Sequence, residues 1–161
     1  MSTLTAEMRR VLDEQQLGFV ATVTPDGKPN LSPKGTTRAW DDDHITFADI
    51  ASPHTVANLL ANPAIEINVV DPIVRKGWRF KGVARVLSEG PLYEAIEQSY
   101  RARGSASPFR HIVVMKVERA EPLWSPSYDL GKTEAEVAET WERKRDELRA
   151  RRASSKVSPA G

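Results

Sequence analysis

The segment from Asn30 to Pro63 contains a regular alternation of polar side chains. Every second position of its first half is polar, at Ser32, Lys34, Thr36 and Arg38. On a β-strand, residues two apart point to the same face of the sheet. A strand face with two cations and two hydroxyls could bind an anion. The same alternation also fits the solvated face of a half-buried strand, so the pattern alone leaves both interpretations open.

A helix start follows the next predicted strand. Ser52 can cap a helix whose first residue is Pro53, where the missing N–H costs nothing. His54 and Thr55 then fall in the first turn. The free amides and the positive dipole end of a helix N-terminus favour a phosphate group. Because a tight turn at residues 41–43 makes the flanking strands neighbours, we predict an anion cradle of amides, hydroxyls, an imidazole and one or two cations.

Two further segments carry candidate functional side chains. Arg79 and Lys81 share one face of a predicted strand, either as ligand contacts or as ordinary surface charges. Trp124 and Tyr128 lie on a proline-rich loop, where ordinary packing is the alternative to a binding role. The histidines outside the cradle follow no metal-ligand spacing, and we predict no metal site.

Composition narrows the class of protein. The chain has 161 residues, 40% of them hydrophobic, with a net charge of +1 and no cysteine. These values fit one domain with a core, and they exclude disulfides and thiolate chemistry. No apolar run approaches the roughly 20 residues that span a bilayer, and residues 1–16 lack the apolar core of a signal peptide. We therefore expect a soluble cytoplasmic protein with no membrane partner.

The basic segment at residues 143–156 has no interleaved aromatic residues for base stacking. Charge pairs spaced i,i+4, such as Glu139 with Arg143, are typical of a solvated helix. We therefore predict no nucleic-acid partner.

Turn signals separate the elements that must position these residues. Pro25, Asp26 and Gly27 form the clearest turn, which predicts a hairpin. The pattern predicts six strands, at residues 18–24, 29–40, 44–49, 64–70, 77–87 and 110–123. Short helices are expected at residues 5–16, from Pro53 to about 62, at 91–104 and at 133–150. Short connections and the lack of a GxGxxG loop favour a small antiparallel barrel over a doubly wound sheet. We expect one domain at residues 1–152 and a disordered tail at 153–161.

The order of these motifs resembles the pyridoxamine 5'-phosphate oxidase-like family, the FMN-binding split barrels. The resemblance rests on "GKPNLSPKGT", "FAD", "NLLANP" and "RFKGVARV" in this order, and it is strongest from Leu17 to Leu87. It implies a mainly β fold, a six-stranded antiparallel split β-barrel with short peripheral helices. It also implies a homodimer with FMN at the interface.

By position, the resemblance places cofactor contacts on two segments. The first comprises Pro33, Lys34, Gly35 and Thr36, with Arg38 as a further contact. The second comprises Ala48 and Asp49, followed by the cradle residues Ser52, His54 and Thr55. Relatives usually carry Arg-Lys or Ser-Lys where this chain has His54 and Thr55. Histidine is a weaker and pH-dependent phosphate partner. The strand with Arg79 and Lys81 approaches the flavin ring or the partner subunit in the resemblance.

The resemblance implies an FMN-dependent oxidoreductase that acts on a small-molecule substrate. The alternatives are a flavin-binding protein without turnover, or a protein that binds F420 or haem in the same barrel. The basic stretch "VRKGWRFK" suits the acidic tail of F420. We do not expect pyridoxamine-phosphate oxidase activity itself, because the arginine- and histidine-bearing substrate segment of that enzyme has no counterpart in this sequence.

Overall fold

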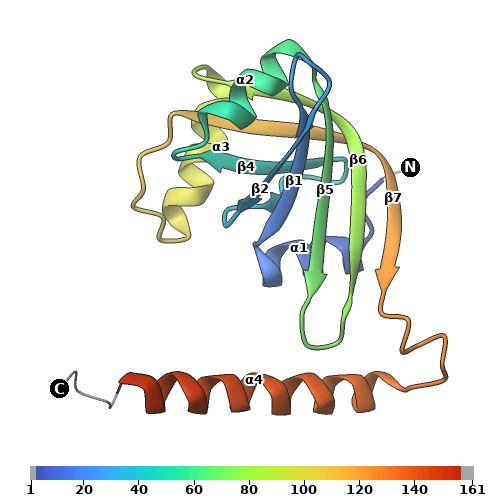
Figure 1. Ribbon diagram of the computed structural model, residues 1–161. Coiled ribbons are helices and arrows are strands. Elements are labelled where there is room, and N and C mark those ends of the chain that lie inside the picture. The colour runs from blue at the N-terminus through green and yellow to red at the C-terminus, as the bar shows by residue number, and fades with distance from the viewer. Residues whose placement is uncertain (1–2, 157–161) are drawn as a thin grey trace.

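Seven strands form one curled antiparallel sheet, in the order β2-β1-β5-β6-β7-β4-β3. The computed structural model describes residues 3–156 (Figure 1). Its elements are α1 (Ala6–Gln15), β1 (Gly18–Val23), β2 (Pro29–Lys34), β3 (Arg38–Ala39), β4 (His44–Asp49), α2 (Pro53–Ala61), β5 (Ala64–Asp71), β6 (Lys76–Leu87), α3 (Pro91–Ala102), β7 (His111–Trp124) and α4 (Glu134–Lys156).

The β1–β2 hairpin confirms the predicted turn. Gly27 has φ +81°, a left-handed conformation that suits glycine, and its amide donates to the carbonyl of Thr24 at 2.9 Å. The register pairs Val23 with Pro29 and Gly18 with Lys34. Residues with odd numbers in this hairpin, such as Leu31, therefore face outward, and Lys34 faces inward.

The predicted second strand is in fact two strands, which gives seven strands instead of six. The chain leaves β2 after Lys34 and enters β3 at Arg38, and these two strands are the opposite edges of the sheet. In the crossing, Thr37 is fully buried, and its amide donates to the carbonyl of Gln16 at 3.0 Å. A Cβ at Gly18 would collide with the Thr37 side chain, so the crossing requires a glycine there. The unpaired edges make the barrel split.

The core lies inside the curl of the sheet. Phe47, Phe80 and Ile67 are fully buried there, and α1 adds Leu12 from below the barrel. A second cluster forms where α3 covers β4 and β7, and Ile96 and Tyr100 are its buried helix residues. Strands β4 and β7 contribute residues to both clusters and so lie between them.

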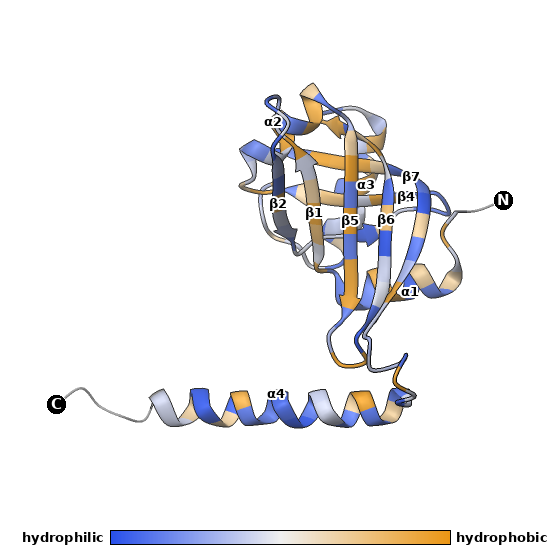
Figure 2. Cartoon of the chain, turned by 45° about the vertical axis from the view of Figure 1, so that its right-hand side comes forward, coloured by the Kyte–Doolittle hydropathy of each residue, from blue (hydrophilic) through white to orange (hydrophobic). Residues whose placement is uncertain are grey.

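Helix α4 runs across below the lower end of the barrel, apart from it (Figure 1), and polar residues cover most of its length (Figure 2). A capping box starts this helix: the Thr133 amide donates to the Glu136 carboxylate at 2.8 Å, and the Glu136 amide donates to the Thr133 hydroxyl at 3.3 Å. Val137 is buried, whereas the described side chains from Glu142 onward are all exposed. The helix continues to Lys156, so residues 153–156 of the expected disordered tail are helical, and the rest of that tail lies outside the described residues. No helix within residues 3–156 combines the length and hydropathy needed to cross a bilayer.

Candidate functional site

The first turn of α2 lacks the side-chain cap that its sequence predicts. Ser52 occupies the N-cap position, but its hydroxyl accepts no hydrogen bond from the helix amides. Instead it accepts from the Nζ of Lys34 at 2.5 Å. Pro53 has no N–H, and within residues 3–156 no side chain caps the other amides of this turn. The N-terminus of α2 therefore keeps its capacity to bind an anion.

Lys34 supplies a buried cation beside that helix end. Its side chain points to the inner face of β2 and is 4% exposed. Its Nζ donates to the hydroxyls of Ser32 at 2.7 Å and Ser52 at 2.5 Å. Burial lowers the pKa of Lys34, and the nearby Asp49 carboxylate partly opposes that shift. An ammonium bound only by hydroxyls in a desolvated site would gain from a phosphate oxygen.

Asp49 connects this helix end to β7. Its carboxylate is 2% exposed; Oδ1 accepts from the Ser52 amide at 2.7 Å, and Oδ2 lies 3.1 Å from Nδ1 of His111. Cross-strand pairing of β4 with β7 places Asp49 opposite His111. His111 was not among the residues that the sequence pattern predicted for the site. Two residues separated by 62 positions give no local signal, and only a correct β4–β7 register could have found the pair.

Thr36 joins the segment between β2 and β3 to β4 and α3. Its hydroxyl accepts from the Ala48 amide at 2.9 Å, and its carbonyl accepts from the Tyr100 hydroxyl at 2.7 Å. Arg38 lies over the Tyr100 ring, 5.4 Å from its centroid. Two guanidinium nitrogens of Arg38, Nε and Nη1, are buried without a hydrogen-bond partner in the described part of the chain. Arg38 thus remains a donor without an acceptor near the site.

The other residues predicted for the site differ in the face they occupy and in their exposure to solvent. Ser32 and Lys34 share the inner face of β2, but the break after β2 removes Thr36 and Arg38 from that face, so the four do not form one row. Pro33 and Gly35 are exposed at the edge of the sheet. His54 is exposed in the first turn of α2, whereas the side chain of Thr55 is buried. Exposed His54 is available to a ligand, and Thr55 contributes to the fit of α2 on the barrel.

Arg79 and Lys81 lie away from the Lys34 end of β2 within the chain. Arg79 is opposite Asn68, which is opposite Phe19, which is opposite Pro33. Three strand spacings separate Arg79 from Pro33, about 14 Å. Arg79 and Lys81 both approach Glu66, at 2.9 and 3.7 Å. A single chain therefore does not bring these two cations to the Lys34 site.

Comparison with known proteins identifies the family. Residues 4–124 match the family model described as pyridoxamine 5'-phosphate oxidase. The chain belongs to the pyridoxamine 5'-phosphate oxidase family. The matched region contains every strand and every residue of the candidate site, and it ends before α4.

Solved structures share this family's fold. HupZ from Group A Streptococcus is 34% identical, with a TM-score of 0.68 over 76% of this chain and 95% of that chain. An FMN-binding protein from Syntrophomonas wolfei is 20% identical, with a TM-score of 0.62 over 71% of this chain and 82% of that chain. An F420 reductase is 20% identical, with a TM-score of 0.57 over 73% of this chain and 98% of that chain. The last two show the shared split-barrel fold alone.

The site of this family member fits the phosphate end of a flavin nucleotide. It offers uncapped amides at a helix N-terminus, a buried ammonium and two hydroxyls, which are the donors that bind phosphate. Lys34, Ser52 and His54 would hold that phosphate. Within residues 3–156, no group of three or more His, Asp or Glu side chains is placed to hold a metal ion.

Proposed function

We propose that this chain is an FMN-dependent oxidoreductase that acts on a small-molecule substrate as a homodimer. The observation that carries the proposal is the Lys34–Ser52 hydrogen bond, which uses the capping hydroxyl of α2 and leaves the helix amides uncapped beside a buried cation. A structural cap would have consumed those donors. FMN would supply the redox chemistry, accepting a hydride from a reduced nicotinamide or a substrate and passing electrons to a small acceptor or to oxygen.

The protein's part is to bind the phosphate and fix its position. Asp49 positions the Ser52 amide, and the hydroxyl of Ser52 positions the Lys34 ammonium. Thr36 holds the Ala48 backbone beside the same edge. These contacts would fix the cofactor's position relative to the barrel before any substrate arrives.

The outer face of the sheet supports the proposed dimer. Leu31 is 67% exposed and Phe19 is 44% exposed, and Pro33 and Val83 add further apolar surface on the outer face of the sheet. An apolar sheet face of this kind in a chain of this family suits a second copy, related by a twofold axis. Arg79 and Lys81 lie on this same face. In the proposed dimer they would approach the partner's cofactor, which they do not reach within their own chain.

The absorption spectrum of the purified protein tests the cofactor, and sedimentation at micromolar concentration tests the dimer. We expect flavin absorption bands and twice the chain mass. Anaerobic addition of NADH or NADPH should then bleach the flavin bands. Flavin bands that no donor bleaches would identify a binding protein without turnover. A Soret band, F420 absorption or a flavin-loaded monomer would each refute the proposal.

A further inference from the structure

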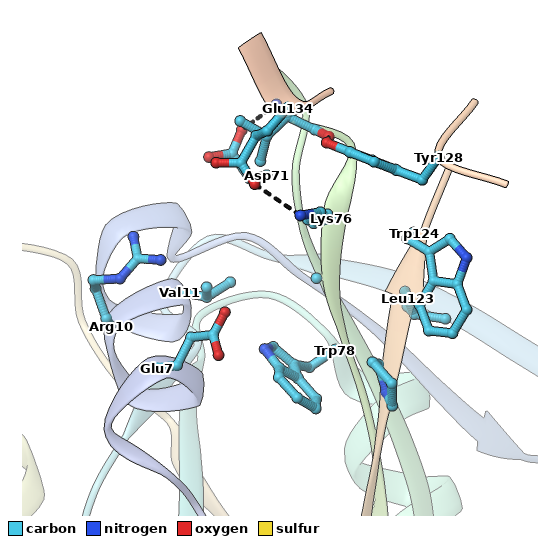
Figure 3. Close-up of a pocket in the computed structure, with 13 residues that line it drawn as sticks. Glu7, Arg10, Val11, Asp71, Lys76, Trp78, Leu123, Trp124, Tyr128 and Glu134 are labelled. Atoms are coloured by element: carbon cyan, nitrogen blue, oxygen red, sulfur yellow. Dashed lines mark hydrogen bonds and ion pairs between the residues drawn. The ribbon is translucent and has the colours of Figure 1, made fainter. Parts of the chain in front are cut away.

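A cavity of about 440 Å³ lies at the end of the barrel that faces α4 (Figure 3). Residues of α1, the facing ends of β5, β6 and β7, the β5–β6 turn, the loop after β7 and the start of α4 line it. Its walls combine apolar and aromatic side chains with several charged groups at the rim. Volumes of 300–1,000 Å³ with this composition are typical of small-molecule sites.

This cavity is separate from the Lys34 site of the same chain. His111 and Trp124 are the first and last residues of β7, and His111 belongs to the Lys34 site whereas Trp124 lines the cavity. Thirteen residue steps of about 3.3 Å place them roughly 40 Å apart along the strand. The two sites share no lining residue, so a ligand held at Lys34 leaves the cavity of its own chain empty.

Three aromatic side chains shape the cavity: Trp78, Trp124 and Tyr128. Hydrogen bonds hold two of them, because the Tyr128 hydroxyl donates to the Val74 carbonyl at 2.6 Å and the Trp124 indole N–H donates to Asp129 at 3.1 Å. Trp124 nevertheless remains 53% exposed. The Lys76 ammonium lies over the Tyr128 ring, 4.5 Å from its centroid, so the tryptophans and not Tyr128 offer faces to a ligand. Aromatic faces that stay open to solvent can stack on a planar ring at little entropic cost.

The charges at the rim favour a cation over an anion. Lys76 pairs with Glu134 at 2.8 Å, and Arg10 pairs with Glu14 at 2.7 Å, so both lining cations already have carboxylate partners. Glu7 lines the cavity opposite Trp78 (Figure 3), and its carboxylate makes no ion pair within residues 3–156. A positively charged ring would gain from this carboxylate and from the electron-rich faces of the tryptophans.

We propose that this cavity binds a planar, positively charged nitrogen heterocycle, as a second ligand site distinct from the phosphate site. The ring stacks on Trp124 and Trp78, and the Glu7 carboxylate balances its charge. The site does not depend on bound FMN.

Three probes of nearly equal size test the charge preference: 1-methylnicotinamide, neutral nicotinamide and anionic nicotinate. Their affinities are measured by calorimetry and by ligand-observed NMR on the full chain. We expect 1-methylnicotinamide to bind at least about fivefold more tightly than nicotinate, with nicotinamide between them. Equal or tighter binding of nicotinate would overturn the proposal, as would no binding of any probe at millimolar concentration.

Variants at exposed positions test the location without threatening the core. Trp124→Leu should weaken 1-methylnicotinamide about 5- to 100-fold, and Trp124→Phe, which keeps a flat ring, should largely retain it. Glu7→Gln should weaken the cation about two- to fivefold and leave nicotinamide unchanged. Glu142→Gln, on the exposed part of α4, is the matched control. Equal effects of Glu7→Gln and Glu142→Gln, or no effect of Trp124→Leu, would place the binding elsewhere.

Competition with FMN separates this proposal from the proposed function. We expect the affinity for 1-methylnicotinamide to be the same with and without saturating FMN. Displacement of the probe by FMN would mean that the cavity is part of a flavin site shared across a dimer, and it would overturn a second ligand site. A protein that binds the probe but no FMN would refute the proposed function and leave this inference standing.

Discussion

Replacing Lys34 with methionine should separate phosphate binding from ring binding. The change keeps an unbranched chain of similar length on the inner face of β2 and removes the ammonium that contacts Ser32 and Ser52. A hydrogen bond to a charged group is worth about 1.5–3 kcal/mol. Because 1.4 kcal/mol corresponds to a factor of ten, Lys34→Met should weaken FMN about 10- to 150-fold. Riboflavin, which lacks the phosphate, should bind almost as before.

The free energy of unfolding of the ligand-free protein should change little. Lys34 loses two hydrogen bonds, which destabilises the variant, but a side chain 4% exposed also no longer has to bury a charge. These effects oppose each other, so we expect a net change within about 1 kcal/mol. A large loss of affinity with unchanged stability would then show that the ammonium acts on the ligand.

Paired titrations of FMN and riboflavin, with urea unfolding of each variant, measure both quantities. Lys28→Met, an exposed lysine on the same hairpin, is the matched control and should change neither affinity. Equal weakening of FMN and riboflavin by Lys34→Met would refute the phosphate assignment and place Lys34 at the ring. No change in either affinity would show that the cofactor does not bind at α2.

Three further predictions concern the framework. Burial raises the pKa of Tyr100 to about 12 from 10.0. Between these pH values the unfolded state releases a proton that the folded state keeps, so the free energy of unfolding should fall as pH rises, by roughly 2–3 kcal/mol. Urea unfolding near pH 8 and pH 12 should show a smaller loss in Tyr100→Phe than in the unchanged protein. Gly82→Ala should lower the free energy of unfolding by on the order of 3 kcal/mol, because the new Cβ would collide with the Lys116 carbonyl. An unchanged melting temperature would contradict this. Removing residues 153–161 should change neither the melting temperature nor flavin affinity, since no described side chain from Glu142 onward is buried.

Local chemistry made much of the fold predictable. Turn residues around Gly27, the proline at the start of α2 and the capping box at Thr133 each act within a few positions, and the structure has all three features. The break between β2 and β3 was not predictable in this way. An unbroken polar alternation continues through Thr36, and only the closure of the sheet on itself bends the chain there.

The site was predictable to the extent that it is local. The sequence pattern singled out the α2 start and Lys34. It placed them together through the turn at residues 41–43, but that turn joins β3 to β4, and β2, which carries Lys34, lies at the opposite edge of the sheet. The burial of Lys34 and the participation of His111 depend on which strands become neighbours across the barrel, and no short-range pattern encodes that. For Arg79 and Lys81 the local pattern was right and the inferred role was not supported within one chain. They do share a face of β6, but both side chains pair with Glu66.

The charges at the N-terminus of α2 explain why this site should still bind an anion. Lys34 and Asp49 are both buried and close enough to influence each other, yet no ion pair joins them among the described residues. Each instead bonds to Ser52, Lys34 to the hydroxyl and Asp49 to the amide. A buried pair kept only for stability would need direct contact to offset its desolvation. Because Ser52 lies between them, the Lys34 ammonium has no anion in direct contact with it among the described residues. A ligand phosphate would supply that anion, and its binding would stabilise the folded chain.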